Sequence, residues 1–157
     1  MFRRQTQLIC IKLHATLRLI RLNQRFIEAL KYIFFTTFTF DNGRSIRSIT
    51  VEDIAKYARK LQEMGARNVL VSRSKDGATL IDEFGEVHSM GNVPGKVLNP
   101  VGCGDSMVAG FVAGYSKTHD YKYALKLGSA CGNATAFCPG LADKDTIDKM
   151  LESEYLK

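Results

Sequence analysis

The chain has 157 residues, of which 45% are apolar and 24% charged, a composition typical of one globular domain. Its formal net charge is +6, and the first 32 residues account for all of it, because they hold seven basic residues and a single acid, Glu28. The rest of the chain is neutral, which argues against a polyanion-binding surface, so we expect no nucleic acid partner.

The cysteines and the apolar runs indicate in which cellular compartment the protein is expected. Cys10, Cys103, Cys131 and Cys138 form no CxxC pair, which favours reduced thiols over a disulfide framework or a zinc site. Charged residues interrupt the apolar runs before the ~18 residues that a membrane span requires. The Arg-rich start overlaps with transit peptides in composition but lacks their run of serines. We therefore expect a cytoplasmic protein without a membrane partner.

The first 47 residues form an atypical basic segment whose strongest strand signal is the uncharged, β-prone run IFFTTFTF. A helix is predicted from Thr50, an N-cap residue with Glu52 and Asp53 in the following turn, and Gly65 ends it. The buried strand NVLVS follows directly. This succession of helix, glycine and strand is one half of a βαβ unit and predicts a parallel sheet.

The remaining predicted elements follow in chain order. The alternating stretch GATLIDEFGEVHSM predicts a β-hairpin that turns at residues 83–85. KVLNPVG predicts a short strand, which ends at the asparagine because a residue before proline is pushed out of the helical region. Two apolar helices are predicted over residues 106–117 and 121–137. A last amphipathic helix over residues 144–154 begins at the N-cap Asp143.

The tetrapeptide GCGD is the strongest chemical signal in the chain. Gly102 and Gly104 let the backbone approach a ligand closely, and the unpaired N–H groups of a helix start favour an anion. Gly102, Cys103 and Gly104 therefore predict an anion hole for a phosphate, beside which Asp105 can accept the proton of an attacking hydroxyl. The alternative interpretation is that Asp105 only caps the helix that Ser106 opens.

A longer stretch, NPVGCGDSMVAGFVAGY, continued by ALKLGSACGNATAF and GLADKDTIDKML, resembles the C-terminal signature of the ribokinase-like (PfkB) carbohydrate kinases. The similarity is strongest to their 1-phosphofructokinase and tagatose-6-phosphate kinase branch, and it runs from Thr50 to Lys157. It implies an α/β fold, the C-terminal portion of a ribokinase-like doubly wound parallel sheet with flanking helices.

The resemblance also implies roles for individual residues. Asp105 falls on the family's catalytic base, which deprotonates the sugar hydroxyl that attacks the γ-phosphate of ATP, and GCG falls on the family's anion hole. The segment SRSKDG falls on the nucleotide-binding loop, and a further residue lies in the helix that passes the adenine pocket. The implied ATP-binding residues are Ser72, Arg73, Ser74, Lys75, Asp76, Gly77, Gly104, Asp105 and Asn133.

Magnesium is expected to enter with ATP, because Mg²⁺ is commonly held by phosphates and waters rather than by a protein cage. His14, His88 and His119 have no partner at ligand spacing in the sequence, so no metal-ligating residues are assigned. Arg73, Ser74 and Lys75 stand where the family carries smaller residues.

The implied function is ATP-dependent phosphorylation of a sugar phosphate, with fructose 1-phosphate as the first expected substrate and tagatose 6-phosphate as the alternative. Residues 48–157 are assigned to the nucleotide-binding and catalytic part of the kinase domain, and the family match is lost in residues 1–47. Because the family's sugar-binding segments are not visible in this sequence, a truncated, non-catalytic nucleotide-binding remnant is a second interpretation. The expected partners are a sugar phosphate, ATP and a second copy of the chain in a homodimer.

Overall fold

The computed structural model describes residues 33–37, 50–63 and 65–156. Most of the basic segment expected at residues 1–47 lies outside these ranges, and so does its charge. The strand β1 (Ile33–Thr37) is described, and it falls within the β-prone run IFFTTFTF, as the sequence indicates. Among the described residues, no helix has both the length and the apolar character to cross a membrane.

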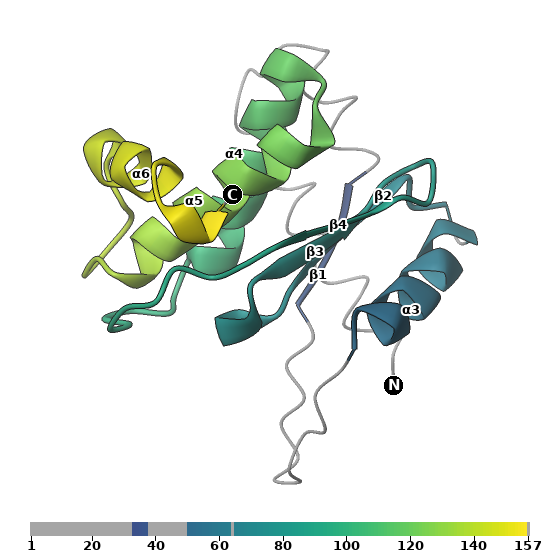
Figure 1. Cartoon of the computed structure of the whole chain (residues 1–157), viewed down its shortest axis with the longest axis horizontal. Coiled ribbons are helices and arrows are strands. Elements are labelled where there is room, and N and C mark those ends of the chain that lie inside the picture. The colour runs from purple at the N-terminus through teal and green to yellow at the C-terminus, as the bar shows by residue number, and fades with distance from the viewer. Residues whose placement is uncertain (1–32, 38–49, 64, 157) are drawn as a thin grey trace, which may run out of the picture.

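A four-stranded sheet lies at the centre of the fold, in the order β1, β2 (Asn68–Ser72), β3 (Ala78–Ile81) and β4 (Val87–Met90) (Figure 1). β1 and β2 are parallel, as the helix, glycine and strand succession predicts. β3 runs antiparallel to β2, and β4 antiparallel to β3, which confirms the predicted hairpin. The described sheet is therefore mixed: one parallel pair is extended by an antiparallel hairpin.

One face of the sheet is covered by α3 (Val51–Glu63). The backbone N–H of Asp53 donates to Thr50 Oγ1 at 3.2 Å, which confirms the predicted N-cap, and Gly65 has the left-handed φ of 107° expected after a helix end. Ile54 and Ala58 are buried against alternate residues of the sheet, namely Val69, Val71 and Ile81. The two-residue period of a strand thus directs every second side chain of β2 toward α3.

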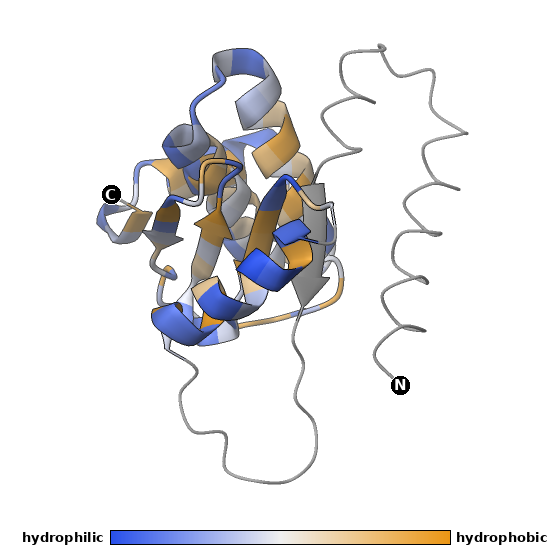
Figure 2. Ribbon diagram, turned by 90° about the vertical axis from the view of Figure 1, so that its right-hand side faces the viewer, coloured by the Kyte–Doolittle hydropathy of each residue, from blue (hydrophilic) through white to orange (hydrophobic). Residues whose placement is uncertain are grey.

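The other face is covered by α4 (Cys103–Thr118), α5 (Tyr121–Ala136) and α6 (Lys144–Leu151). Leu70 and Leu80 point to this face and pack with Phe111 and Leu125 in the main core. Figure 2 shows the same division, with apolar segments where helices meet the sheet and polar ones on the outer helix turns. The strands β2 and β3 are thus buried between two helical layers.

Three boundaries differ from the sequence prediction. Residues 91–100 contain no strand, because the amides of Leu98 and Asn99 are bonded to the Ala136 carbonyl, that of Val93 is bonded to the Asn133 side chain, and no described strand lies alongside. α4 begins at Cys103 rather than at residue 106, because Gly102 turns the chain into the helix. α6 ends at Leu151, and a 3₁₀ turn, η2 (Glu154–Leu156), follows it.

Candidate functional site

The start of α4 presents backbone donors in the way that GCGD predicts. Gly102 is the N-cap in the left-handed region, with φ 87° and ψ −6°, and makes no side-chain cap bond. The first helical hydrogen bond runs from the Ser106 N–H to the Gly102 carbonyl at 2.8 Å. The amides of Cys103, Gly104 and Asp105 therefore precede the bonded part of the helix, at the positive end of its dipole. We call the backbone of residues 102–105 the α4 start.

Asp105 lies in the first turn of α4 and is exposed. The interpretation of Asp105 as a helix cap is wrong, because Gly102 occupies the N-cap position and the helix is already formed at Asp105. Within the described part of the chain, nothing hydrogen-bonds or ion-pairs with its carboxylate. The carboxylate is therefore open to solvent beside the three amides, where it can meet an external hydroxyl.

The α4 start is held against the end of α5. Asn99 makes the principal connection: its Nδ2 donates to the Pro139 carbonyl at 3.1 Å, and its Oδ1 accepts the Val101 N–H at 3.0 Å. The Thr135 hydroxyl donates to the Ser106 hydroxyl at 3.0 Å. Sequence reasoning missed Asn99 as a positioning residue, although an asparagine before proline in a tight turn is a recognisable signal.

Cys103 contributes a backbone amide next to a half-buried thiol. Burial raises the pKa of this thiol, so the side chain stays neutral near pH 7. The Cys103 Sγ donates to the Asn99 carbonyl at 3.5 Å, which turns it toward protein rather than toward the amides. The α4 start therefore carries no thiolate charge that would oppose a phosphate.

The predicted nucleotide loop, residues 72–77, connects β2 to β3 and contains the 3₁₀ turn η1 (Ser74–Asp76). The Arg73 N–H donates to the Gly77 carbonyl at 2.7 Å and closes the loop. Gly77 has φ 88°, and a Cβ added there would lie 2.0 Å from the Met90 carbonyl oxygen, so only glycine fits. Ser74, Lys75 and Asp76 are exposed, whereas Ser72 and Arg73 are half-buried.

Arg73 has an unusual arrangement. Its guanidinium NH2 group donates to the Asp76 carbonyl at 2.6 Å, whereas its buried Nε has no hydrogen-bond partner among the described residues. A buried donor without a partner costs free energy, and an acceptor such as a phosphate oxygen would relieve that cost. Arg73 stands where the family carries smaller residues, and its buried, unpartnered Nε is a hydrogen-bond donor that a smaller side chain lacks.

Asn133 on α5 is buried and its side chain is fully engaged with the backbone. Its Oδ1 accepts the Val93 N–H at 3.3 Å, and its Nδ2 donates to the Ser129 carbonyl at 2.8 Å. Asn133 therefore positions the segment that follows β4. Its predicted contact with ATP stays a prediction.

Contacts along this segment connect the two predicted parts of the site. The nucleotide loop touches the end of β4 at Gly77. Val93, which follows β4, donates its N–H to Asn133. Gly132, next to Asn133, packs against Cys103, since a Cβ on Gly132 would lie 3.2 Å from the Cys103 carbonyl oxygen. The nucleotide loop and the α4 start are thus coupled through the chain from β4 to α5.

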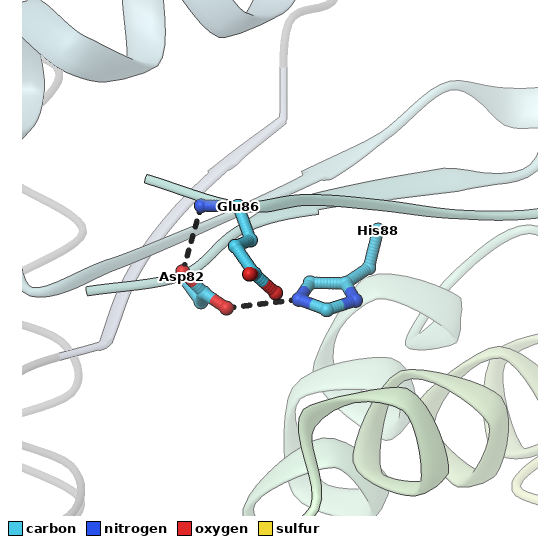
Figure 3. Close-up of side chains that lie close together, drawn as sticks. All are labelled: Asp82, Glu86 and His88. Atoms are coloured by element: carbon cyan, nitrogen blue, oxygen red, sulfur yellow. Dashed lines mark hydrogen bonds and ion pairs between the residues drawn. The ribbon is translucent and has the colours of Figure 1, made fainter. Parts of the chain in front are cut away.

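A second group of chemically active side chains lies elsewhere, on the β3–β4 hairpin. Asp82, Glu86 and His88 bring their ligand atoms within 4.8 Å of one another (Figure 3). Sequence reasoning treated His88 as isolated. The missed signal is the two-residue alternation across a tight hairpin, which places residues on either side of the turn on one face.

The sequence profile of pfkB family carbohydrate kinases matches residues 20–148, which is most of the chain. The chain therefore belongs to the pfkB family of carbohydrate kinases. The profile match begins at residue 20, whereas the resemblance identified in the sequence begins at Thr50.

Three proteins illustrate the similarity. 1-Phosphofructokinase from Bacillus subtilis (strain 168) is 44% identical over 110 residues, covering 69% of this chain and 35% of that protein. D-tagatose-1-phosphate kinase from Bacillus licheniformis is 35% identical over 103 residues, covering 66% and 34%. The structure of a candidate phosphofructokinase from Staphylococcus aureus superposes with a TM-score of 0.64 at 36% identity, covering 76% and 39%. The chain spans about a third of the length of the curated relatives it matches.

Proposed function

We propose that this chain supplies the nucleotide-binding and catalytic part of an ATP-dependent sugar-phosphate kinase, with fructose 1-phosphate as substrate and fructose 1,6-bisphosphate as product. The observation that carries the proposal is the exposed Asp105 carboxylate beside three backbone amides at the α4 start. The 44% identity to a 1-phosphofructokinase supports this substrate. Tagatose 6-phosphate is the alternative substrate, and the 35% identity to a D-tagatose-1-phosphate kinase supports a tagatose phosphate.

The chemistry follows from the two groups at the α4 start. Asp105 accepts the proton of the sugar hydroxyl, the hydroxyl oxygen forms a bond to the γ-phosphorus of ATP, and the bond to the bridging oxygen breaks to release ADP. The amides of Cys103, Gly104 and Asp105 donate to the phosphoryl oxygens, where negative charge must be stabilised during transfer. Magnesium, carried by the phosphates and waters, supplies further charge neutralisation.

The nucleotide loop supports the same proposal. The Arg73 Nε–H needs an acceptor, and the exposed Lys75 adds a second positive charge to the loop. Both suit a polyphosphate better than a neutral ligand. The bond from the Val93 N–H to Asn133 ties the segment after β4 to α5, which supports a site formed by this loop and the α4 start.

A second candidate is a nucleotide-binding protein without catalytic turnover. The observation that favours it is the nucleotide loop: the buried Arg73 Nε has no hydrogen-bond partner among the described residues, and binding a polyphosphate there needs no sugar. Transfer requires both reactants to be positioned, and residues that hold the sugar in a longer kinase have no counterpart identified here. For either candidate function, we expect a cytoplasmic location and a homodimer.

A paired experiment tests the proposal. A thermal-shift titration with Mg-ATP should raise the melting temperature, because a ligand of the folded state stabilises it by mass action. An assay that couples ADP release to fructose 1-phosphate should then detect turnover, which Asp105→Asn should reduce by about 100-fold or more, the usual range for loss of a general base. Asp145→Asn is the matched control, because Asp145 is also an exposed acid in the first turn of a helix, α6.

The outcomes separate the candidates. A thermal shift without turnover on either sugar phosphate supports the nucleotide-binding candidate. Turnover that Asp105→Asn and Asp145→Asn leave equally unchanged contradicts the assignment of the base. Absence of any Mg-ATP shift contradicts both candidates.

A further inference from the structure

We propose that the turn of the β3–β4 hairpin binds a divalent metal ion of the zinc type through Asp82, Glu86 and His88. We call these three side chains the hairpin cluster. The cluster is separate from the proposed kinase site, because the nucleotide loop precedes β3 whereas Asp82 directly follows it. The two therefore lie at opposite ends of the same strand.

The strand register places all three side chains on one face. Leu80 pairs with His88 and Ile81 pairs with Val87, so Asp82 and Glu86 follow as the next pair toward the turn. Alternation then puts Asp82 on the face of Leu80, and Glu86 on the face of His88. Figure 3 shows the three side chains converging on that face, toward the helices.

The distances suit a small ion. Asp82 Oδ2 lies 2.9 Å from His88 Nε2, and the ligand atoms of all three residues lie within 4.8 Å of one another. Zinc bonds of about 2.0–2.2 Å in a tetrahedral site place ligand atoms about 3.3 Å apart. Asp82 and His88 are already near that separation, and the ligand atom of the exposed Glu86 lies within 4.8 Å of both.

Asp82 is organised in advance as a ligand. It is 2% exposed, and its Oδ1 accepts the N–H groups of Phe84 and Glu86, each at 2.9 Å. These two bonds fix the plane of the carboxylate and leave Oδ2 aimed at His88. Backbone donors that orient a ligating carboxylate in this way are a regular part of metal sites.

The donor set indicates the kind of metal. One imidazole nitrogen with two carboxylate oxygens suits Zn²⁺ and related ions, whereas Mg²⁺ and Ca²⁺ prefer oxygen ligands throughout. The two carboxylate side chains also supply negative charge that a divalent cation would balance. Three protein ligands leave a fourth tetrahedral position for water.

The neighbouring charges do not occupy the cluster. Glu83 is paired with Arg67 at 3.2 Å and accepts a hydrogen bond from the Tyr121 hydroxyl at 2.9 Å. Burial raises the pKa of Tyr121, which keeps that hydroxyl protonated. The ring of Tyr121 lies 6.2 Å from that of His88 and covers the cluster on the side of α5.

Calorimetric titration of the chelator-treated full chain with Zn²⁺ tests the proposal. We expect one saturable equivalent in the parent, and affinity at least about 10-fold weaker in Glu86→Gln and in His88→Gln, since even outer-sphere partners of a metal site are worth that much. The matched controls are Glu152→Gln and His119→Asn, exposed residues outside the cluster, which should bind as the parent does. Asparagine suits the left-handed φ of 56° at His119.

Glu86→Gln decides the outcome if His88→Gln fails to fold, because the Glu86 side chain is exposed and far-ultraviolet circular dichroism should show its fold intact. Saturable binding that both cluster variants weaken supports the site. Absence of saturable binding by the parent, or equal affinity in parent and Glu86→Gln, overturns it and leaves the Asp82–His88 bond as a brace of the hairpin.

Discussion

Asn133 on α5 accepts a hydrogen bond from the backbone N–H of Val93 at 3.3 Å and so fixes the segment that leaves β4. Replacing Asn133 by alanine leaves that buried N–H unpaired and removes the side-chain bond to the Ser129 carbonyl. We expect a loss of about 1–3 kcal/mol in the free energy of unfolding, measured by urea denaturation.

Ser129→Ala is the control for this variant. The Ser129 hydroxyl is buried and has no partner among the described residues, so its removal should cost little. Equal destabilisation by the two variants would mean that the bond to Val93 contributes nothing of its own.

Gly102→Ala should impair both stability and nucleotide binding. An alanine at φ 87° costs about 1–2 kcal/mol, and its Cβ would also lie 3.3 Å from the Leu141 side chain. Relief of that strain would move the amides of the α4 start. We therefore expect a smaller Mg-ATP thermal shift as well as a lower melting temperature.

Gly85→Ala separates strain from function in this experiment. Gly85 has a similar φ of 83°, but nothing lies within 4 Å of its Cβ position. It should lose similar stability and keep the full Mg-ATP shift. If Gly102→Ala also keeps the full shift, the α4 start does not hold a phosphate.

Gly77→Ala, at the single glycine of the nucleotide loop, should be strongly destabilising. Its Cβ would lie 2.0 Å from the Met90 carbonyl oxygen, so the loop must separate from β4. Gly65→Ala, with φ 107° and no atom within 4 Å, measures the backbone strain alone. We expect Gly77→Ala to lose at least about 2 kcal/mol more than Gly65→Ala in urea denaturation, the usual cost of overpacking. Equal losses would contradict the close contact.

The Cys103 thiol should react slowly with iodoacetamide near pH 7, because burial raises its pKa and depletes the thiolate. Labelling, followed by peptide mass spectrometry, should accelerate with rising pH and slow again when Mg-ATP covers the α4 start. Labelling at the rate of free cysteine would contradict the assigned burial.

The same shift has a consequence for stability. The folded pKa of Cys103 lies above the unfolded value of about 8.5, so the contribution of the protonated thiol is complete below that pH and is lost as pH rises through the folded pKa. The urea midpoint should therefore fall less steeply above pH 9 in Cys103→Ala than in the parent.

The sequence predicted the helix ends that are determined by a capping residue or a glycine at the end itself. The Thr50 cap bounded α3, Gly65 ended it, and the Asp143 side chain accepts the Thr146 N–H at 2.8 Å at the start of α6. Each of these ends is decided by residues within four positions of one another, so no knowledge of the packing is needed.

Features that depend on distant partners were not predictable in this way. The true start of α4 follows from a left-handed Gly102 without a capping side chain, so Asp105 was a plausible but incorrect cap. The expected strand before Pro100 has β-prone residues but no described neighbour to bond. Asn99 and Asn133 act through backbone groups far away in the sequence, and the hairpin cluster depends on strand register.

The glycines between α4 and α5 determine how this part of the molecule can move. A Cβ on Gly110 would lie 2.6 Å from Cys131 Sγ, and one on Gly128 would lie 2.7 Å from the Met107 carbonyl oxygen, so the two helix backbones nearly touch. Helices this close cannot slide or rotate separately without a collision. Any closure over a bound nucleotide must therefore carry α4 and α5 together as one rigid body, and residues 93–99, which are bonded to α5 and its end, must move with them.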